Sequence, residues 1–408
     1  MMGTWLDYVI VLAFFAVMIL IGFVGSRMAK SSEDYLVAGR NLPIWIYIPG
    51  LASIVLGGGA TFGVAKLGYE VGVSGAWLTA MYGLGIMTMG FLLSSKISNI
   101  RVFSLSEMLG LRYSKYARYM SAAISAFYTA MITVVNSIAV GTIFHSLLGW
   151  SYTVSILVGG GIALFYTIAG GMCSIFINDI IQFCLMTIGI FFILVPMGLG
   201  KVGGFAGLSQ KLDPSFLNPV SIGWETIFAW FLLFFLGIMI GQDVWQKVFT
   251  AKNNKVARNG AIAAGVYIVF WAIAMALIGA ICLALMPNLA NGQEALPRLA
   301  IHVVPTGLLG IVLAAMLSAL LSTISGTLIA SSTLIYNDLI LPFMKKTIDK
   351  RQEVLYTRLI TGTVGVMVLI TAITIGDVLV ALDIAYAILS GSIFIPIFAG
   401  FFWKRATW

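Results

Sequence analysis

Charged residues are scarce in this sequence. They make up only 9% of its 408 residues, whereas hydrophobic residues make up 60% and the mean hydropathy is +1.03. Soluble domains usually carry about 25% charged residues. The scarcity of charge therefore excludes a soluble globular protein and indicates one that is embedded in a membrane.

Histidine and cysteine are also rare, with two and three residues respectively. His145 and His302 fall at predicted outer helix ends and form no cluster of the kind that catalysis needs. The cysteines suggest neither a disulfide framework nor a metal cluster. Nothing resembles the repeated carbonyl rings of a channel filter. We therefore expect neither an enzyme nor a channel.

Long polar segments are missing as well. Eleven mostly apolar stretches of about 20 residues or more follow one another along the chain. They lie at residues 5–26, 44–66, 73–95, 116–147, 151–169, 175–199, 223–250, 258–286, 306–337, 356–375 and 379–403. We expect a single all-α polytopic transmembrane domain over residues 1–408, whose first stretch is a retained helix because it lacks a basic leading region and a cleavage site.

The basic residues are distributed unevenly between the two sides of the predicted membrane. If the amino terminus is outside, 19 of the 23 lysines and arginines fall on the inner side, and only Lys66, Lys201, Lys211 and Arg298 remain outside. This positive-inside pattern predicts a multi-pass protein of the cell inner (plasma) membrane that contacts anionic lipid. The net charge of +8 then gives no reason to expect nucleic acid, and no obligate protein partner is implied.

The predicted helices divide into two sets of five after the first one. Repeat one covers residues 44–199 and repeat two covers residues 223–403. Because five is odd, the second set enters the membrane in the opposite orientation, which is the pattern of an inverted repeat. We expect one amino-terminal helix followed by a five-plus-five inverted-repeat helix bundle.

Glycines interrupt the first helix of each predicted repeat. Gly57, Gly58 and Gly59 lie about 13 residues into the first, and Gly237 and Gly241 lie at the corresponding place in the second. Matching breaks in matching helices indicate a binding site at the membrane midplane, where unwound carbonyls and half-helix ends face a ligand. Close helix packing is the alternative, because small residues also favour it.

A second unusual stretch is SALLSTISGTLIASS at residues 318–332. Ser318, Ser322 and Ser325 fall on one helix face, with Thr323 beside them. Hydroxyl and carbonyl oxygens are hard ligands that suit a small hard cation. The alternative is that these hydroxyls bond back to carbonyls of their own helix.

Several longer motifs resemble the sodium:solute symporter family. They are SSEDYLVAGRNLP (31–43), YTIAGGMCSIFINDIIQ (166–182), VWQKVFTAKNNKVARNG (244–260), LSTISGTLIASSTLIYNDL (321–339) and GFFWKRAT (400–407), and they occur in family order. The resemblance implies a leucine-transporter-type fold. It also implies a secondary active transporter that moves a small solute into the cell together with Na+, by alternating access.

The resemblance also implies where sodium binds. The common sodium site falls on the carbonyls of Ser53, Leu56 and Ala319 and on the hydroxyls of Ser322 and Thr323. A second cation site would use Asp179, Ser322 and Ser325, together with a hydroxyl where this chain has Gly326. Asp179 has an alternative role as a packing or gating carboxylate.

The solute is predicted less directly. Sugar-binding members carry amide and carboxylate groups where this chain has Val55, Gly59 and Ala60, which disfavours a sugar. The expected solute-binding residues are Gly57, Gly58, Gly59, Thr79, Tyr82, Gln242 and Asp243. An intramembrane carboxylate such as Asp243 needs a partner or a function. It would either bind an amine or a proton, or pair with Lys247 one turn later.

We therefore expect a solute that is amine-bearing or zwitterionic. Two alternatives remain at this point: a proton-coupled symporter, and a transporter-like sensor domain of a larger signalling protein. Near the outer mouth, Lys66 and Glu70 are four residues apart and are expected to form an ion pair.

Overall fold

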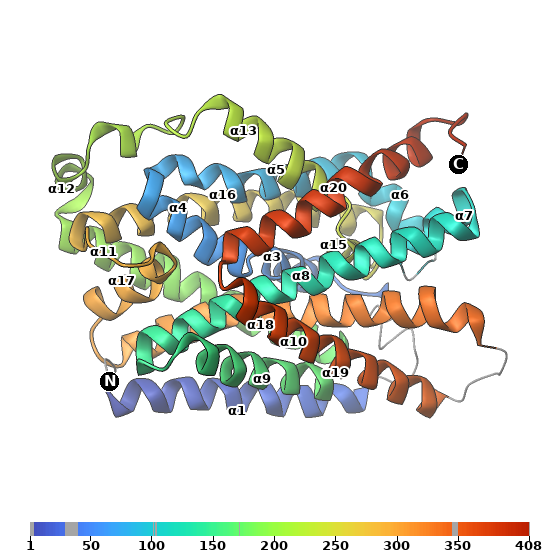
Figure 1. Cartoon of the computed structure of the whole chain (residues 1–408), viewed down its shortest axis with the longest axis horizontal. Coiled ribbons are helices and arrows are strands. Elements are labelled where there is room, and N and C mark those ends of the chain that lie inside the picture. Colours follow the sequence, from blue (N-terminus) through green and yellow to red (C-terminus); the bar gives the residue numbers. More distant parts are fainter. Residues whose placement is uncertain are drawn as a thin grey trace.

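The computed structural model describes residues 4–28, 40–100, 102, 104–170, 172–344 and 350–407. Its long helices run side by side along the horizontal axis of Figure 1, with the amino terminus at one end of the bundle and the carboxyl terminus at the other. In the described residues seven helices are long and apolar enough to cross a membrane, or eight if one bent pair is counted as a span. The predicted all-α polytopic fold is confirmed.

Each of the eleven apolar stretches has become helical. The amino-terminal helix is α1 (Trp5–Met28). Repeat one contains α3 (Ile44–Val55), a π-helical turn (Gly59–Gly63), α4 (Val64–Val71), α5 (Trp77–Leu92), α8 (Lys115–Leu148), α9 (Tyr152–Gly170), α10 (Met172–Thr187) and α11 (Val195–Val202). Repeat two contains α13 (Trp224–Trp230), α14 (Leu236–Ile238), α15 (Gln242–Val248), α16 (Asn254–Leu285), α18 (Leu308–Thr333), α19 (Lys350–Ile375) and α20 (Val378–Phe402).

Short helices lie at the two ends of the bundle (Figure 1). α6 (Ser94–Asn99) and α7 (Leu105–Arg112) lie at the end that holds the carboxyl terminus, and α12 (Gly204–Lys211) and α17 (Ala295–Val303) lie at the opposite end. At the first of these ends the chain before α3 pairs with the chain after α15. Leu42 and Ala251 form a parallel bridge there, through the Leu42 N–H to Thr250 carbonyl bond (3.0 Å) and the Lys252 N–H to Leu42 carbonyl bond (3.1 Å).

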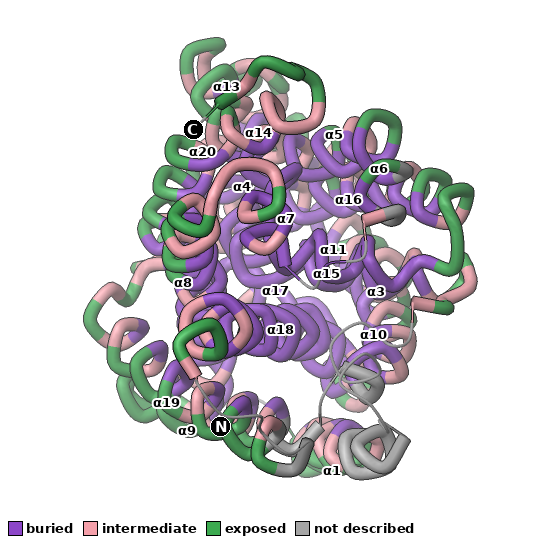
Figure 2. The backbone as a smooth tube through the Cα atoms, turned by 90° about the vertical axis from the view of Figure 1, so that its right-hand side faces the viewer, coloured by how far each residue is buried: buried purple, intermediate pink, exposed green. Residues whose placement is uncertain are grey.

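Helix α18 is the centre of the molecule. Its most apolar stretch is 89% buried, against 33% for that of α19 and 39% for that of α20, and Figure 2 shows it surrounded by other helices. A helix that is apolar on all sides is expected to be enclosed in this way. The hydroxyl-rich face of α18 therefore lies inside protein, where its polar groups need partners.

The first break separates α3 from the π-helical turn. Leu56 ends α3 with φ −84° and ψ 27°, outside the helical range, and Gly57 and Gly58 connect it to the turn. A Cβ atom on Gly57 would lie 2.5 Å from Asn136 Oδ1 and 2.7 Å from Thr323 Oγ1, so only glycine fits between α8 and α18. Close packing and helix breakage, which were alternatives in the sequence, are combined in this one residue.

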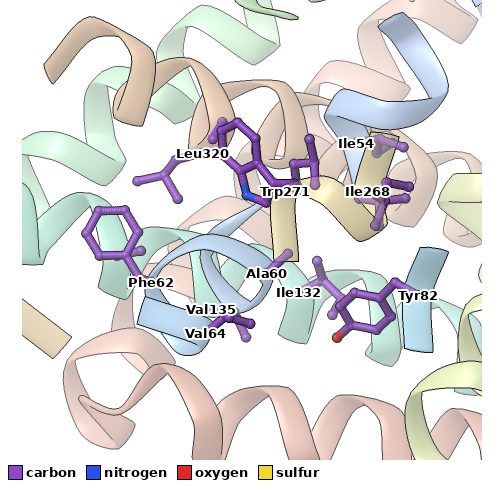
Figure 3. Close-up of a cluster of buried hydrophobic side chains, with 14 of the residues drawn as sticks. Ile54, Ala60, Phe62, Val64, Tyr82, Ile132, Val135, Ile268, Trp271 and Leu320 are labelled. Atoms are coloured by element: carbon purple, nitrogen blue, oxygen red, sulfur yellow. The ribbon is translucent and has the colours of Figure 1, made fainter. Parts of the chain in front are cut away.

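Figure 3 shows the apolar packing that holds this broken segment. Trp271 and Ile268 of α16 pack with Ala60 and Phe62 of the π-helical turn, and all four side chains are buried. Because the broken segment is fixed by large rigid side chains, its exposed backbone groups have defined positions.

The second break lies at the corresponding point of repeat two. The segment Trp224–Ile238 meets α15 at an angle of 46°, across Met239, Ile240 and Gly241. Gly241 is extended, with φ −64° and ψ 127°, and a Cβ on Gly237 would lie 2.5 Å from a Tyr386 ring atom. The predicted pair of broken helices is therefore present.

One basic residue is not where the charge pattern assigned it. Lys247 was counted with the inner-side charges, but its side chain is only 1% exposed, because it belongs to α15, a helix buried within the bundle. Lys30, Arg101, Lys345 and Lys346 from the same count lie outside the described residues.

Candidate functional site

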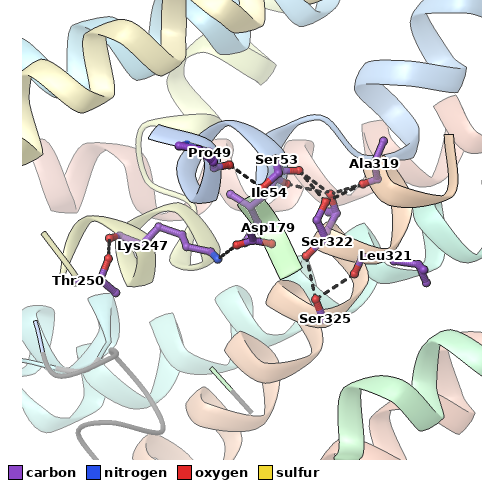
Figure 4. Close-up of polar contacts among 11 residues, drawn as sticks. Pro49, Ser53, Ile54, Asp179, Lys247, Thr250, Ala319, Leu321, Ser322 and Ser325 are labelled. Carbon is purple, nitrogen blue, oxygen red and sulfur yellow. Dashed lines mark hydrogen bonds and ion pairs between the residues drawn. The ribbon is translucent and has the colours of Figure 1, made fainter. Parts of the chain in front are cut away.

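A cluster of uncharged oxygens joins the first break to α18 (Figure 4). Ser322 Oγ lies 3.0 Å from the carbonyl oxygens of both Ser53 and Ala319. Thr323 Oγ1 lies 3.1 Å from the Ile54 carbonyl and 3.2 Å from the Ala319 carbonyl. The two hydroxyl groups can donate only two protons, whereas three carbonyl oxygens face them, so the cluster has more acceptors than donors. Such an excess of converging oxygens suits a small hard cation.

The structure brings together four of the five predicted sodium ligands: Ser53, Ala319, Ser322 and Thr323. The carbonyl of the fifth, Leu56, accepts a bond from Thr61 Oγ1 at 2.7 Å. Ile54 supplies a carbonyl that the sequence did not single out. No local signal could have identified it, because which carbonyls face α18 depends on where α3 unwinds.

Asn136 of α8 supports the first break and was missed in the sequence. Its Oδ1 accepts the N–H of Gly58 at 2.8 Å, and its Nδ2 donates to the Ile132 carbonyl at 2.7 Å. The side chain thereby replaces a backbone partner that Gly58 lost when the helix broke. An asparagine in the middle of an apolar helix was the available signal, since polar side chains in such helices usually have a function.

A cavity lies between the two breaks. It is lined by Ile54, Val55, Gly57, Gly58, Gly59, Ala60, Tyr82, Tyr128, Ile132, Val135, Asn136, Ile238, Asp243, Thr323, Leu382 and Tyr386. Its volume is about 20 Å³, which is room for little more than one water molecule. Five predicted solute-binding residues, Gly57, Gly58, Gly59, Tyr82 and Asp243, therefore meet around one small cavity.

Tyrosine rings from α5, α8 and α20 form one wall of this cavity, and Phe234 packs against one of them. The ring centroid of Tyr386 lies 5.2 Å from that of Tyr128, 5.3 Å from that of Phe234 and 5.4 Å from that of Tyr82. Tyr128 donates from its hydroxyl to the Tyr386 hydroxyl at 3.1 Å, whereas the buried Tyr82 hydroxyl has no partner. The faces of such rings attract cations.

Asp243 brings a buried carboxylate to the same cavity. The residue is 3% exposed, and its Oδ1 has no hydrogen-bond partner. Lys247 does not pair with it, because the Lys247 Nζ lies 2.5 Å from Asp179 Oδ2 on α10. Of the two alternatives for Asp243, the ion pair with Lys247 is therefore excluded, and Asp243 Oδ1 has no hydrogen-bond partner that would keep a cation away.

Two predicted solute-binding residues do not line the cavity. Thr79 Oγ1 donates to the Ala60 carbonyl at 3.3 Å, behind the first break. Gln242 Oε1 accepts the N–H of Leu105 at 2.8 Å. The Gln242 side chain is thus turned towards the start of α7, whereas Asp243 lines the cavity.

The residues predicted for a second cation site are already engaged. Asp179 holds Lys247, and Ser325 Oγ donates to the carbonyls of Leu321 (2.9 Å) and Ser322 (3.1 Å). Ser325 thus follows the back-bonding alternative, in which a hydroxyl bonds to carbonyls of its own helix.

The ion pair expected between Lys66 and Glu70 is not formed. Lys66 pairs instead with Asp377 at 2.7 Å, because Asp377, the N-cap residue of α20, lies against α4.

Comparisons with known proteins agree with this geometry. The model of the sodium:solute symporter family matches residues 35–408. The chain is 24% identical to the sodium/pantothenate symporter of Haemophilus influenzae over 99% of this chain and 86% of that protein. It is 24% identical to the sodium/proline symporter of Escherichia coli over 87% of this chain and 73% of that protein.

Among solved structures, a Na+-coupled sialic acid symporter in a substrate-bound outward-open state matches with a TM-score of 0.83. The match covers 99% of this chain and 88% of the other at 20% sequence identity. At that identity the likeness establishes a shared fold.

Proposed function

Because this chain belongs to the sodium:solute symporter family, we propose that it carries an amine-bearing or zwitterionic solute through the cavity between its two broken helices. Sodium-coupled solute transport is the activity of the family, so the chain is a multi-pass membrane transporter and not an enzyme. The proposal concerns which solute is carried and which residues hold it and the ion.

Sodium is held by the oxygen cluster of the first break. Two hydroxyls and two carbonyls converge there, and each hydroxyl oxygen lies within 3.4 Å of both carbonyl oxygens. The hydroxyls belong to Ser322 and Thr323, and the carbonyls to Ser53 and Ala319. The Leu56 carbonyl joins them when Thr61 releases it. A sodium ion loses most of its water on binding, so it needs such a set of prearranged oxygens.

The unpaired Asp243 carboxylate carries the argument for the solute class. A buried carboxylate is costly without a positive partner, yet Asp243 Oδ1 has no hydrogen-bond partner and the Lys247 ammonium is paired with Asp179. Tyr82, Tyr128 and Tyr386 surround the same cavity with ring faces and edges. A protonated amine would satisfy both features, with a charge-assisted hydrogen bond to Asp243 and cation–π contacts to the rings.

The relatives do not agree on a solute. Their names specify pantothenate, glucose and proline, and the structural neighbour binds sialic acid. Of these, proline combines an amine with a carboxylate. Solute choice in such a fold depends on the side chains around the cavity, so Asp243 and the three tyrosines are the residues to test.

The cavity volume of about 20 Å³ supports an alternating-access cycle. Small-molecule sites usually occupy several hundred Å³, so the helices around the two breaks must move apart before a solute enters. Sodium coupling follows if the ion favours the conformation in which the solute site is formed.

The topology belongs to the proposal as well. The asymmetry of basic residues supports a single transmembrane domain over residues 1–408 in the cell inner (plasma) membrane, with the amino terminus outside and anionic lipid at the inner ends. No obligate protein partner is required by this arrangement.

Thermal unfolding of the purified protein tests the solute class. The probes are putrescine, proline, glucose and pantothenate, which represent a cation, a zwitterion, a neutral sugar and an anion, each added in sodium buffer and in potassium buffer. A ligand that binds the folded state raises the unfolding temperature. We expect stabilisation by proline or putrescine, and only with sodium present. Stabilisation by glucose or pantothenate alone would refute the amine assignment.

A proton is the second candidate for the Asp243 carboxylate, because its free oxygen would accept one as readily as an amine. Uptake that is driven equally well by a proton gradient in sodium-free buffer would favour this alternative. Loss of uptake without sodium would exclude it.

A further inference from the structure

We propose that the Lys247 ammonium stays paired with the Asp179 carboxylate throughout the transport cycle and takes the place of a second Na+. The protein then binds and moves a single Na+. The inference rests on the sodium site proposed above. It assigns to Lys247 a role in setting the number of Na+ ions that bind, and this role does not depend on contact with the solute.

The Asp179–Lys247 pair is one of the most deeply buried groups of charges in the described residues. The two side chains are 2% and 1% exposed, and Lys247 Nζ also lies 4.0 Å from the centroid of the Phe176 ring. Phe176 and Asp179 are three residues apart on α10 and so share one face of it. The ammonium group is thus held by a carboxylate on one side and a ring face on the other.

This pair lies next to the proposed sodium site (Figure 4). A Cβ atom on Gly50 would lie 3.5 Å from Asp179 Oδ2, and Gly50 precedes Ser53 by one helical turn on α3. A bare carboxylate at this place would attract a cation more strongly than the neutral oxygens of the sodium site do. Lys247 prevents this by supplying the positive charge from the protein itself.

Apart from its own carboxylate, Asp179 has few side-chain oxygens around it, so the lysine ammonium suits this place better than Na+ does while Lys247 is present. Ser325 directs its hydroxyl to its own helix, and Gly326 brings no side-chain oxygen. A Cβ atom on Gly326 would lie 2.4 Å from Ile54 Cδ1, so a larger side chain does not fit there. The described residues contain no group of three or more histidines, cysteines, aspartates or glutamates that could hold a metal. An ammonium needs fewer ligands than Na+, because it brings its own protons to its acceptors.

The location of Lys247 explains why it can remain in place through a transport cycle. It belongs to α15, the half-helix after the second break, whereas Asp179 belongs to α10 of repeat one. The chain after α15 is in turn paired with the chain before α3 at Leu42 and Ala251. The ammonium is therefore anchored to the same end of the bundle as the carboxylate that it neutralises.

Counting bound ²²Na+ per chain on the purified protein at pH 8.5, without any solute, tests this inference. We expect one Na+ for the wild type. Lys247→Met keeps the length of the side chain but removes its charge, so Asp179 should take a second Na+ and the count should rise to two. The double variant Asp179→Asn with Lys247→Met removes both charges and should return the count to one. Lys255→Met, on an exposed lysine of the same end of the bundle, should leave it at one.

Two Na+ on the wild type, or one on Lys247→Met, would overturn the inference. So would a Lys247→Met variant that cannot be purified in sodium buffer although the double variant can, because sodium should replace the missing charge. Failure of the proposed sodium site gives a different result: Ser322→Ala with Thr323→Ala would still bind one Na+. If both proposals hold, that variant binds its Na+ about tenfold or more weakly, and adding Lys247→Met restores one bound Na+ at a concentration that leaves the double alanine variant mostly empty.

Discussion

The two broken helices occupy matching places in the two repeats, but they bring different chemistry to the centre of the protein. Around the first break the polar groups are all neutral: the carbonyls of Ser53 and Ile54, the hydroxyls of Ser322 and Thr323, and the amide of Asn136. Around the second break they are charged, with Asp243 facing the cavity and Lys247 one turn later facing Asp179.

This difference separates two tasks that one backbone geometry makes possible. Neutral oxygens can release a cation again, because they attract it less strongly than a buried carboxylate does. A carboxylate beside a small cavity instead selects for charge, since it binds a cation and excludes an anion. The repeated fold thus provides two interruptions near the midplane, and the side chains around each one decide what it binds.

Blocking the first break should have the largest effect. Gly57→Val places a branched side chain where a Cβ alone would lie 2.5 Å from Asn136 Oδ1 and 2.7 Å from Thr323 Oγ1. We expect sodium affinity to fall at least about hundredfold, or roughly 2.8 kcal/mol, with loss of uptake. Gly161→Val in α9, where a Cβ meets nothing within 4 Å, is the matched control. Normal ²²Na+ binding by the Gly57 variant would show that the first break plays no part in holding the ion.

Neutralising the second break should affect the solute and not the ion. Asp243→Asn keeps the shape of the side chain but removes the charge that would bind an amine. We expect solute binding to weaken by about 1.5–3 kcal/mol, which is the usual contribution of a hydrogen bond to a charged group, while ²²Na+ binding is unchanged. Thermal unfolding with proline or putrescine measures the first effect. Equal losses of both ligands would mean that the two breaks do not have separate tasks.

Removing the hydroxyls of α18 tests the first break with a smaller change. Ser322→Ala with Thr323→Ala takes away two of the converging oxygens but leaves the carbonyls of Ser53 and Ala319. The sodium concentration for half-maximal uptake should rise about tenfold or more, equivalent to about 1.4 kcal/mol. Solute affinity at saturating sodium should change less, because coupling transmits only part of the loss. An unchanged sodium dependence would contradict the assignment.

The smallest effect is expected where α4, the second half of the first broken helix, is held by an ion pair to the N-cap residue of α20. Lys66 Nζ lies 2.7 Å from Asp377 Oδ2, and the two side chains are 16% and 30% exposed. Burial raises the pKa of Asp377, but the bonds from Lys66 and from the N–H groups of Val380 and Leu379 together lower it below the usual 3.8. A lowered pKa stabilises the folded state above pH 3.8, and this contribution is lost as the pH falls further.

Asp377→Asn should therefore reduce the free energy of unfolding at neutral pH by about 1 kcal/mol or less, as expected for a pair that is partly exposed. The wild type and the variant should converge in thermal stability as the pH falls through the lowered pKa. A constant difference between them at all pH values would show that the carboxylate charge is not what matters at this position.

Much of this architecture could be predicted from the sequence because it depends on local composition. Runs of apolar residues dictate membrane helices, an odd number of helices per repeat dictates inversion, and consecutive glycines weaken a helix wherever they occur. Ser322 and Thr323 lie on the buried face of a helix that is apolar all round, so their need for polar partners was also evident. The fold class and the two breaks follow from such patterns, whereas the set of proposed sodium ligands was implied by the resemblance to the sodium:solute symporter family.

The partners of the buried side chains were decided only by the tertiary structure. Lys247 lies four residues from Asp243 in sequence, yet it pairs with Asp179, which is 68 residues away. Asn136 bonds to Gly58 across 78 residues, and Tyr128 meets Tyr386 across 258. Each of these contacts depends on the rotation of two helices about their axes and on the distance at which their side chains interlock. No short stretch of sequence contains that information, because it results from the packing of the whole bundle.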